Sequence, residues 1–275
     1  MASHDTKIVL ITGANTGIGW EAVKAFLQSD AHYLVLMGSR SLDKAAEAIA
    51  KVRQEVPNSR STVEPVQVDI SSDDSIQSAY EAVQTKYGRL DALVNNVGAS
   101  YEGEARQGKC TMREAWNKNF DVNVSGTYVM TQTFMPLLLK SSGGGRLLFI
   151  TSGLSSLSKY SEQPYPAPKP PAGEGKWPKE ELDQFNDTMA YRSTKTALNM
   201  MMLNFAWQLT NDNVKVFAIS PGFLVTGLGG MTEAMKKRRA GPASVGGQFI
   251  KDVVEGKRDA DAGKIVHSNG SVQPW

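Results

Sequence analysis

Residues 7–19 read KIVLITGANTGIG, and this stretch decides the fold of the chain. Its first five residues, Lys7 to Ile11, form a short apolar run rich in β-branched side chains, which predicts a buried strand. A glycine-rich turn follows, and residues 20–27 then have the apolar spacing of a helix. A strand, a glycine turn and a helix N-terminus in this order can cradle an anion. The free N–H groups and the positive end of the helix dipole face the same point.

The glycines of this turn are spaced G-x-x-x-G-x-G, from Gly13 through Gly17 to Gly19. Glycine permits a sharp turn and lets the backbone approach a phosphate closely. The dinucleotide fingerprint is G-x-G-x-x-G, and glycine turns also join strands to helices without any ligand. The stretch alone therefore predicts either a nucleotide site or a plain connection.

Composition sets broad limits on the class of protein. A chain of 275 residues can bury a large core, and a single α/β unit is common at this length. The formal net charge of +2 gives no support for a nucleic-acid partner, and the basic run 236–239 is expected on a solvated face or loop. Cys110 is the only cysteine and the three histidines are scattered, so neither a disulfide nor a metal centre is expected. With no signal pattern and no apolar run of membrane-spanning length, we expect a cytoplasmic protein.

Strand-like and helix-like segments alternate along the chain. Alternation of this kind implies right-handed crossovers and a parallel sheet that is covered on both faces. We therefore predict an α/β fold with a doubly wound parallel sheet (a Rossmann fold) of about seven strands, as a single domain over residues 1–275. After the first unit, strands are expected at residues 33–37, 63–68, 90–94, 146–151, 214–219 and 264–267, and helices at 42–55, 73–87, 112–139 (with a bend at Pro136) and 189–209.

Residues 158–187 interrupt this alternation with six prolines and two glycines. The segment is predicted to be a semi-stiff insertion, with a helix only at residues 179–185. A long insertion in a compact domain is often a lid or a binding loop, but it can equally be a surface excursion. The sequence leaves both interpretations open.

Tyr191 and Lys195 are four positions apart in the expected helix 189–209, so they share one face. A free tyrosine has a pKa of about 10, too high for ready proton exchange near neutrality. A nearby ammonium group favours the phenolate and lowers that pKa, which makes Tyr191 a candidate general acid or base. Such a pair also occurs by chance on many helices, so further residues are needed to support the assignment.

Several polar residues directly follow expected strands. Ser152 follows the strand at 146–151, and the segment Asn95-Asn96-Val97-Gly98 follows the strand at 90–94. Ligands bind beyond the carboxyl ends of the strands in a parallel sheet, so these residues are expected to meet at one edge. Asn123 falls inside an expected helix, where Asn is a poor helix former, and it either faces the same crevice or is exposed.

Together these residues resemble the short-chain dehydrogenase/reductase family, over nearly all of residues 6–275 apart from the insertion. The turn at residues 12–19 is similar to the cofactor loop of that family. Residues 95–98 are similar to its N-N-A-G motif, with Val97 replacing Ala and adding bulk near the cofactor. The resemblance implies a catalytic tetrad of Asn123, Ser152, Tyr191 and Lys195.

The resemblance also implies where a nicotinamide dinucleotide binds. Asp69 corresponds to the acidic residue near the adenine, and Ser220-Pro221-Gly222 with Thr226 corresponds to the loop that holds the nicotinamide amide. The residues implied at the cofactor are Gly13, Asn15, Thr16, Gly17, Ile18, Gly19, Arg40, Asp69, Ile70, Asn96, Gly98, Tyr191, Lys195, Pro221, Gly222 and Thr226.

Arg40 favours NADP(H) over NAD(H) as this cofactor. An acidic residue after the second strand would bind a ribose 2′-hydroxyl and repel a 2′-phosphate. The chain instead has Gly38-Ser39-Arg40-Ser41 there, and a guanidinium group suits a phosphate. The alternative is that Arg40 only stacks on the adenine.

The long separation of Ser152 from Tyr191 indicates a resemblance to one subgroup of the family. The family usually places about a dozen residues between this Ser and Tyr, whereas here they are 39 positions apart. The chain is similar in this respect, and in its ending Ser271-Val272-Gln273-Pro274-Trp275, to the monomeric carbonyl reductases. The resemblance therefore implies a monomer, with a dimer as the alternative.

The resemblance implies reduction of a carbonyl carbon by hydride transfer from NADPH. Ser152 would hydrogen-bond the carbonyl oxygen, Tyr191 would deliver the proton, and Lys195 would lower the tyrosine pKa and hold the nicotinamide ribose. Asn123 would position a water that links Lys195 to the proton supply.

Apolar residues near the expected crevice predict a small-molecule substrate that is hydrophobic, aromatic or polycyclic. The alternative is that they pack the insertion onto the core. Two other functions remain: a ketoreductase dedicated to one natural-product pathway, or an NADP-binding scaffold with a cyclase-like or regulatory role, against which the intact tetrad argues. The apolar residues in question are Leu154, Leu157, Tyr160, Tyr165, Trp177, Phe223, Leu224, Leu228 and Met231.

Overall fold

The chain folds around a single seven-stranded sheet. A computed structural model describes residues 6–162, 172, 174–175, 177 and 188–275. The sheet order is β3-β2-β1-β4-β5-β6-β7, and every neighbouring pair is parallel, so the predicted doubly wound fold is confirmed. The direction of winding reverses between β1 and β4, which is where ligands bind in such sheets. The strands are β1 (Lys7–Ile11), β2 (Tyr33–Ser39), β3 (Thr62–Gln67), β4 (Ala92–Asn95), β5 (Gly145–Ile150), β6 (Val214–Ser220) and β7 (Ile265–His267).

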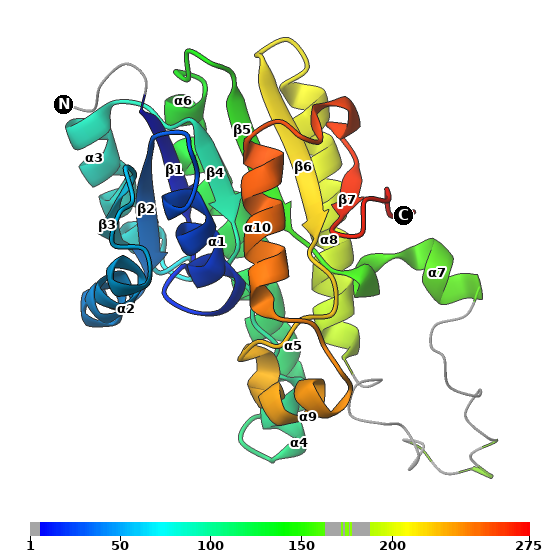
Figure 1. Cartoon of the computed structure of the whole chain (residues 1–275). Helices are drawn as coiled ribbons and strands as arrows, with labels where there is room; N and C mark the ends of the chain where they lie inside the picture. Colours follow the sequence, from blue (N-terminus) through cyan, green and yellow to red (C-terminus); the bar gives the residue numbers. More distant parts are fainter. Residues whose placement is uncertain (1–5, 163–171, 173, 176, 178–187) are drawn as a thin grey trace.

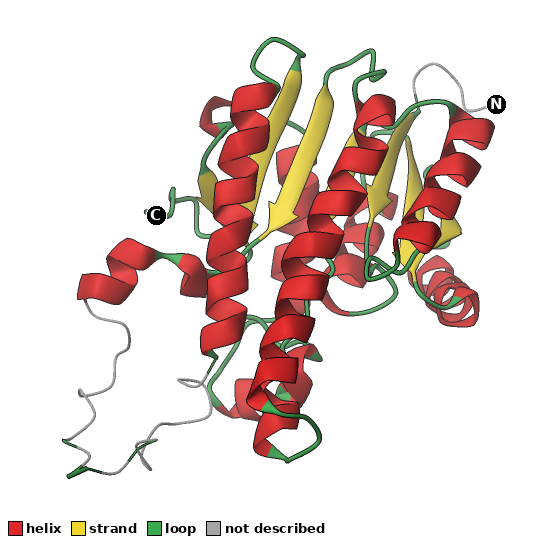
Figure 2. Cartoon of the chain, turned by 180° about the vertical axis from the view of Figure 1, so that it is seen from behind, coloured by secondary structure: helices red, strands yellow, loops and turns green. Residues whose placement is uncertain are grey.

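Helices cover both faces of the sheet. The inner strands are apolar on both sides: Val9 and Ile11 face one helix layer, whereas Ile8 and Leu10 face the other. The first layer lies in front in Figure 1, and the second is seen from behind in Figure 2. The first layer contains α1 (Gly17–Leu27), α2 (Leu42–Glu55) and α10 (Ala243–Val254), and the second contains α3 (Asp73–Tyr87), α6 (Gly126–Leu138) and α8 (Met189–Gln208).

Local signals in the sequence set several helix ends. The Ser72 hydroxyl accepts a hydrogen bond from the Ser75 amide at the start of α3, and Gly88 ends that helix with a φ of 71°. Ser41 caps α2 in the same way, through the Lys44 amide. Four shorter α-helices occur in the described part of the chain, and α4 and α9 lie beyond the carboxyl ends of the strands (Figure 1). These helices are α4 (Glu102–Arg106), α5 (Met112–Phe120), α7 (Leu157–Glu162) and α9 (Thr232–Lys237).

The helix expected at residues 112–139 is interrupted earlier than predicted. A π-helical turn at Asp121–Ser125 separates α5 from α6, whereas Pro136, the predicted bend, lies within α6. The turn follows from tertiary contacts. A Cβ on Gly126 would lie 2.0 Å from the Ile70 carbonyl oxygen, so the backbone there is pressed against the loop after β3. Single π turns inside helices are frequent at functional sites.

Other elements also differ from the sequence prediction. The helices α4, α7, α9 and α10 were not expected, and α7 occupies the start of the proposed insertion. The helix predicted at residues 179–185 lies outside the described residues. In α10, a Cβ on Gly247 would lie 2.4 Å from the Glu21 carbonyl carbon, so this glycine lets α10 cross α1 at very short range.

The outer strands of the sheet are β3 and β7. In β3, Pro65 pairs in register with Met37 of β2 and offers no N–H group of its own. Along β7, the segment 271–273 runs antiparallel: the Gln273 amide donates to the Ile265 carbonyl, and the His267 amide donates to the Ser271 carbonyl. Within the described part of the chain, no helix is both long enough and apolar enough to cross a membrane.

Candidate active site

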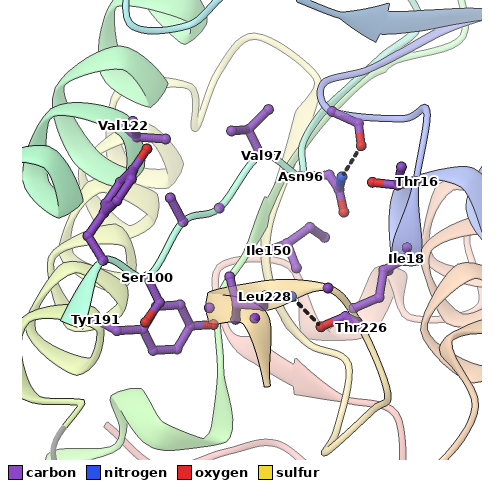
Figure 3. A pocket seen from close by; sticks show the side chains of 18 of the residues that line it. Thr16, Ile18, Asn96, Val97, Ser100, Val122, Ile150, Tyr191, Thr226 and Leu228 are labelled. Atoms are coloured by element: carbon purple, nitrogen blue, oxygen red, sulfur yellow. Dashed lines mark hydrogen bonds between the residues drawn. The ribbon is translucent and has the colours of Figure 1, made fainter. Parts of the chain in front are cut away.

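A cleft of about 710 Å³ opens at the carboxyl ends of the central strands, where the winding direction reverses. Figure 3 shows Tyr191 on one side of this cleft and Thr16, Ile18 and Asn96 on the other. Ser152 lines the cleft, as do nearly all the residues predicted at the cofactor. These are Gly13, Asn15, Thr16, Gly17, Ile18, Arg40, Asp69, Ile70, Asn96, Gly98, Tyr191, Lys195, Pro221, Gly222 and Thr226.

The glycine turn is shaped to bring backbone N–H groups to the cleft. Gly13 and Gly17 have φ angles of 61° and 58°, which residues other than glycine rarely adopt. At the start of α1, Thr16 makes no side-chain cap, and the first intrahelical bond is donated by Trp20. The N–H groups of the first helical turn are therefore uncommitted, which fits the binding of a phosphate.

Gly19, by contrast, does not line the cleft. A Cβ on Gly19 would lie 2.5 Å from the Asn96 side-chain nitrogen, so this glycine serves close packing of α1 against the loop after β4. The Asn96 amide in turn donates to the Thr12 carbonyl at 2.8 Å and to the Gly13 carbonyl at 3.2 Å. These bonds hold the loops after β1 and β4 together and fix the floor of the cleft.

Arg40 directly follows β2 and lines the cleft. Its guanidinium makes no hydrogen bond or ion pair with any other residue in the described ranges. The neighbouring Ser39 hydroxyl donates to the Ser41 carbonyl at 3.0 Å. A cation without a partner in a cleft, beside hydroxyl groups, is suited to a phosphate.

The residues of the predicted proton-transfer group meet at the other end of the cleft. Tyr191 and Lys195 lie in the first turns of α8, and the Lys195 Nζ is 5.6 Å from the centre of the Tyr191 ring. Lys195 is buried and its ammonium donates to the Ile150 carbonyl oxygen at 2.8 Å. Ser152 follows β5, and its Oγ accepts a hydrogen bond from the Leu154 amide at 3.1 Å.

Burial dominates the electrostatics of this group. It raises the pKa of Tyr191 to about 12; a hydrogen bond with Ser152 opposes this rise, and the charge of Glu102 adds to it. Burial lowers the pKa of Lys195 to about 8. The Lys195 ammonium is directed at the Ile150 carbonyl, and its expected effect on the tyrosine pKa stays a prediction. With its pKa raised by burial, Tyr191 is protonated at neutral pH.

Asn123 does not line the cleft either, and the water-positioning role expected of it stays a prediction. Its side chain is fully buried in the π-helical turn. Its Oδ1 accepts from the Ala99 amide at 2.8 Å, and its Nδ2 donates to the Ala99 carbonyl at 2.9 Å and to Thr194 Oγ1 at 3.0 Å. Both amide protons are thus committed to holding the loop after β4 against α8.

The far end of the cleft differs most from the sequence prediction. Of the apolar residues expected there, only Leu228 lines the cleft among those described, whereas Leu157 and Trp177 are exposed and Tyr165 is outside the described residues. Residues from the segment 100–109 instead line this end, and their position just after the N-N-V-G segment is the sequence signal that could have identified them. The residues that line this end are Ser100, Tyr101, Gly103, Glu104, Gln107, Lys109, Leu228, Gly229 and Gly230.

Comparison with known proteins gives the family. A family model described as short chain dehydrogenase matches residues 7–172, and the chain belongs to this family of oxidoreductases.

Individual relatives are similar over the full length. "Short-chain dehydrogenase/reductase tropE" of Talaromyces stipitatus is 46% identical over 277 residues, covering 100% of both chains. The crystal structure of an NADPH-bound carbonyl reductase from chicken fatty liver has a TM-score of 0.75 at 21% identity, covering 98% of this chain and 99% of that one. A 3-oxoacyl-[acyl-carrier protein] reductase from Brucella melitensis in complex with NAD has a TM-score of 0.74 at 20% identity, covering 97% and 96%.

Proposed function

We propose that this protein is an NADPH-dependent reductase that converts the carbonyl group of a small molecule to an alcohol. The observation that carries the proposal is the convergence of Ser152, Tyr191 and Lys195 at one end of the cleft whose other end is the glycine turn. A dinucleotide lying between these ends would present its nicotinamide to the tyrosine.

When bound, the nicotinamide supplies the hydride. The other steps belong to the chain. Ser152 hydrogen-bonds the substrate oxygen and stabilises the charge that develops on it. Tyr191, protonated at neutral pH, donates the proton to that oxygen. Lys195, whose Nζ lies 5.6 Å from the centre of the tyrosine ring, would hold the nicotinamide ribose.

Arg40 supports NADPH rather than NADH, because its guanidinium has no competing partner in the described part of the chain. We expect Arg40→Ala to raise the KM for NADPH about 10- to 100-fold, the effect of losing charged hydrogen bonds of about 1.5–3 kcal/mol. The KM for NADH should change little. Arg60→Ala, which removes an exposed arginine beside His32, is the matched control. Equal losses with both cofactors would show that Arg40 does not read the 2′-phosphate.

The lining of the far end suggests the substrate class. We propose an aromatic or polycyclic ketone or aldehyde that also carries hydroxyl or carboxyl groups. Tyr101, Val122 and Leu228 offer apolar contacts, whereas Gln107 and Lys109 offer polar ones. This differs from a purely hydrophobic substrate, because most of the apolar residues first expected there lie elsewhere.

An NADPH-consumption screen tests the function. The panel should pair each aromatic ketone with its hydroxylated or carboxylated analogue, and we expect turnover to favour the analogues. Turnover of a single compound would favour an enzyme dedicated to one natural-product pathway. NADPH binding without turnover of any compound would favour a regulatory or cyclase-like scaffold.

We also propose that the protein acts in the cytoplasm as a monomer. Met200 and Trp207 on α8 are 69% and 77% exposed, and these side chains are the observation that favours a dimer instead. Sedimentation equilibrium across a range of concentrations distinguishes the two states.

A further inference from the structure

Glu102 is a buried acidic residue for which the proposed mechanism has no use. It is the first residue of α4, and its side chain is only 7% exposed. Buried carboxylates are rare unless their oxygens are paired. Here Oε1 accepts from the Tyr191 backbone amide at 2.7 Å, and Oε2 accepts from Ser100 Oγ at 2.9 Å and from Asn119 Nδ2 at 3.1 Å.

The contact with the Tyr191 amide compensates for a deficiency of α8. That helix starts at Met189 with no side-chain cap from Thr188 and no acidic residue in its first turn. Among the described residues of this helix and the residue before it, no side chain therefore caps the first amides. Glu102, 89 positions earlier in the chain, supplies both the acceptor and the negative charge that favour a helix N-terminus.

The same residue is joined to the wall of the cleft. Its neighbours Tyr101, Gly103 and Glu104 all line the far end, where the substrate is proposed to bind. Asn119 of α5 secures this arrangement, because its Oδ1 accepts from the Tyr101 amide and its Nδ2 donates to Glu102. The substrate wall and the start of the catalytic helix are thus linked through one carboxylate.

We propose that Glu102 is a positioning residue for Tyr191: its carboxylate caps the catalytic helix and couples it to the substrate wall. The proposal rests on the proposed reductase function for its kinetic consequence. Glu102 does not line the cleft, so the proposed role involves no contact between Glu102 and the cofactor.

The electrostatic consequence has a definite sign. The negative charge of Glu102 raises the pKa of Tyr191. Removal of that charge lowers this pKa, so the tyrosine loses its proton at a lower pH and reduction declines earlier as pH rises. The charged side chains on α4, α5 and α8, which pack around this point, are Glu102, Glu104, Arg106, Arg113, Glu114, Lys118, Arg192 and Lys195.

The decisive measurement is the pH profile of kcat/KM for the carbonyl substrate. In Glu102→Gln we expect the basic limb to move to lower pH and kcat to fall about tenfold, with the KM for NADPH unchanged. Glu102→Asp keeps the charge but shortens the side chain, so kcat should fall while the limb stays at the wild-type pH. Glu81→Gln, on the exposed face of α3, is the charge-matched control and should alter neither quantity.

A basic limb that does not move in Glu102→Gln, or that moves equally in Glu81→Gln, overturns the proposal, because a purely structural residue would lower activity at every pH alike. Amide hydrogen exchange of the wild-type protein provides a test that needs no variant. The Tyr191 amide should be protected, and exchange at the rate of a free helix-terminal amide overturns the cap. If the wild type reduces no carbonyl compound, the proposed function fails, while the exchange result still decides the cap.

Discussion

Replacing Tyr191 by Phe should reduce kcat for carbonyl reduction about a thousandfold, the range expected for loss of a positioned general acid. The substitution removes only the phenol oxygen and keeps the ring that packs beside Lys195. The dissociation constant for NADPH should therefore stay within about twofold of the wild-type value, because the interaction lost is made in the transition state. Stopped-flow kinetics with fluorescence titration of NADPH measures both quantities.

Tyr128→Phe provides the matched control for this variant. Tyr128 is 44% exposed on α6, and its hydroxyl accepts a hydrogen bond from Gln132. Its loss should leave kcat unchanged. If Tyr191→Phe retains more than about a tenth of wild-type kcat, proton delivery by this tyrosine is excluded on the magnitude that general acids contribute.

Replacing Gly247 by Ala should destabilise the fold by about 2–3 kcal/mol, although alanine is the better helix former. Helix propensity alone favours Ala over Gly by about 1 kcal/mol. At this position, however, the new Cβ would lie 2.4 Å from the Glu21 carbonyl carbon and 2.6 Å from the Ala22 nitrogen. Both are backbone atoms of α1, so no rotamer change relieves the overlap and the helices must separate.

Thermal unfolding measures this effect, and the midpoint should fall by about 5–10 °C for a domain of this size. Gly143→Ala is the control, because a Cβ at Gly143 would meet no atom within 4 Å. Its stability should change by less than about 0.5 kcal/mol. An unaltered midpoint in Gly247→Ala would mean that α1 and α10 are not packed as closely as described.

The predictable part of the fold was the part that hydrophobic periodicity encodes. Strands such as β1 are apolar on both faces, and capped helices such as α3 have signals at both ends, so the doubly wound parallel sheet could be predicted from their alternation. The helix α10 was missed because Gly246 and Gly247 argue against a helix in local terms. Both glycines serve tertiary packing, because each lets α10 approach another segment closely.

The site residues also divide into those that local signals predict and those that depend on tertiary contacts. Residues next to strand ends, such as Ser152 and Asn96, were placed in the cleft by a general property of parallel sheets. Gly19 was expected there from the spacing of the glycine turn and Asn123 from its place inside a helix and the family resemblance, and here each turns its contacts inward to support neighbouring loops. Glu102 gave no signal at all, because its role depends on a contact between residues 89 positions apart.

The two outer strands have a consequence for how copies of this protein can meet. An open edge of a sheet is a template for the addition of strands from another molecule, and proline blocks such addition because it lacks an N–H group. Pro65 interrupts one edge at β3, while residues 271–273 occupy the other along β7 and are followed by Pro274. Edge-to-edge polymerisation into a continuous sheet is thereby disfavoured at both ends, and any self-association of the folded protein is directed to its helices.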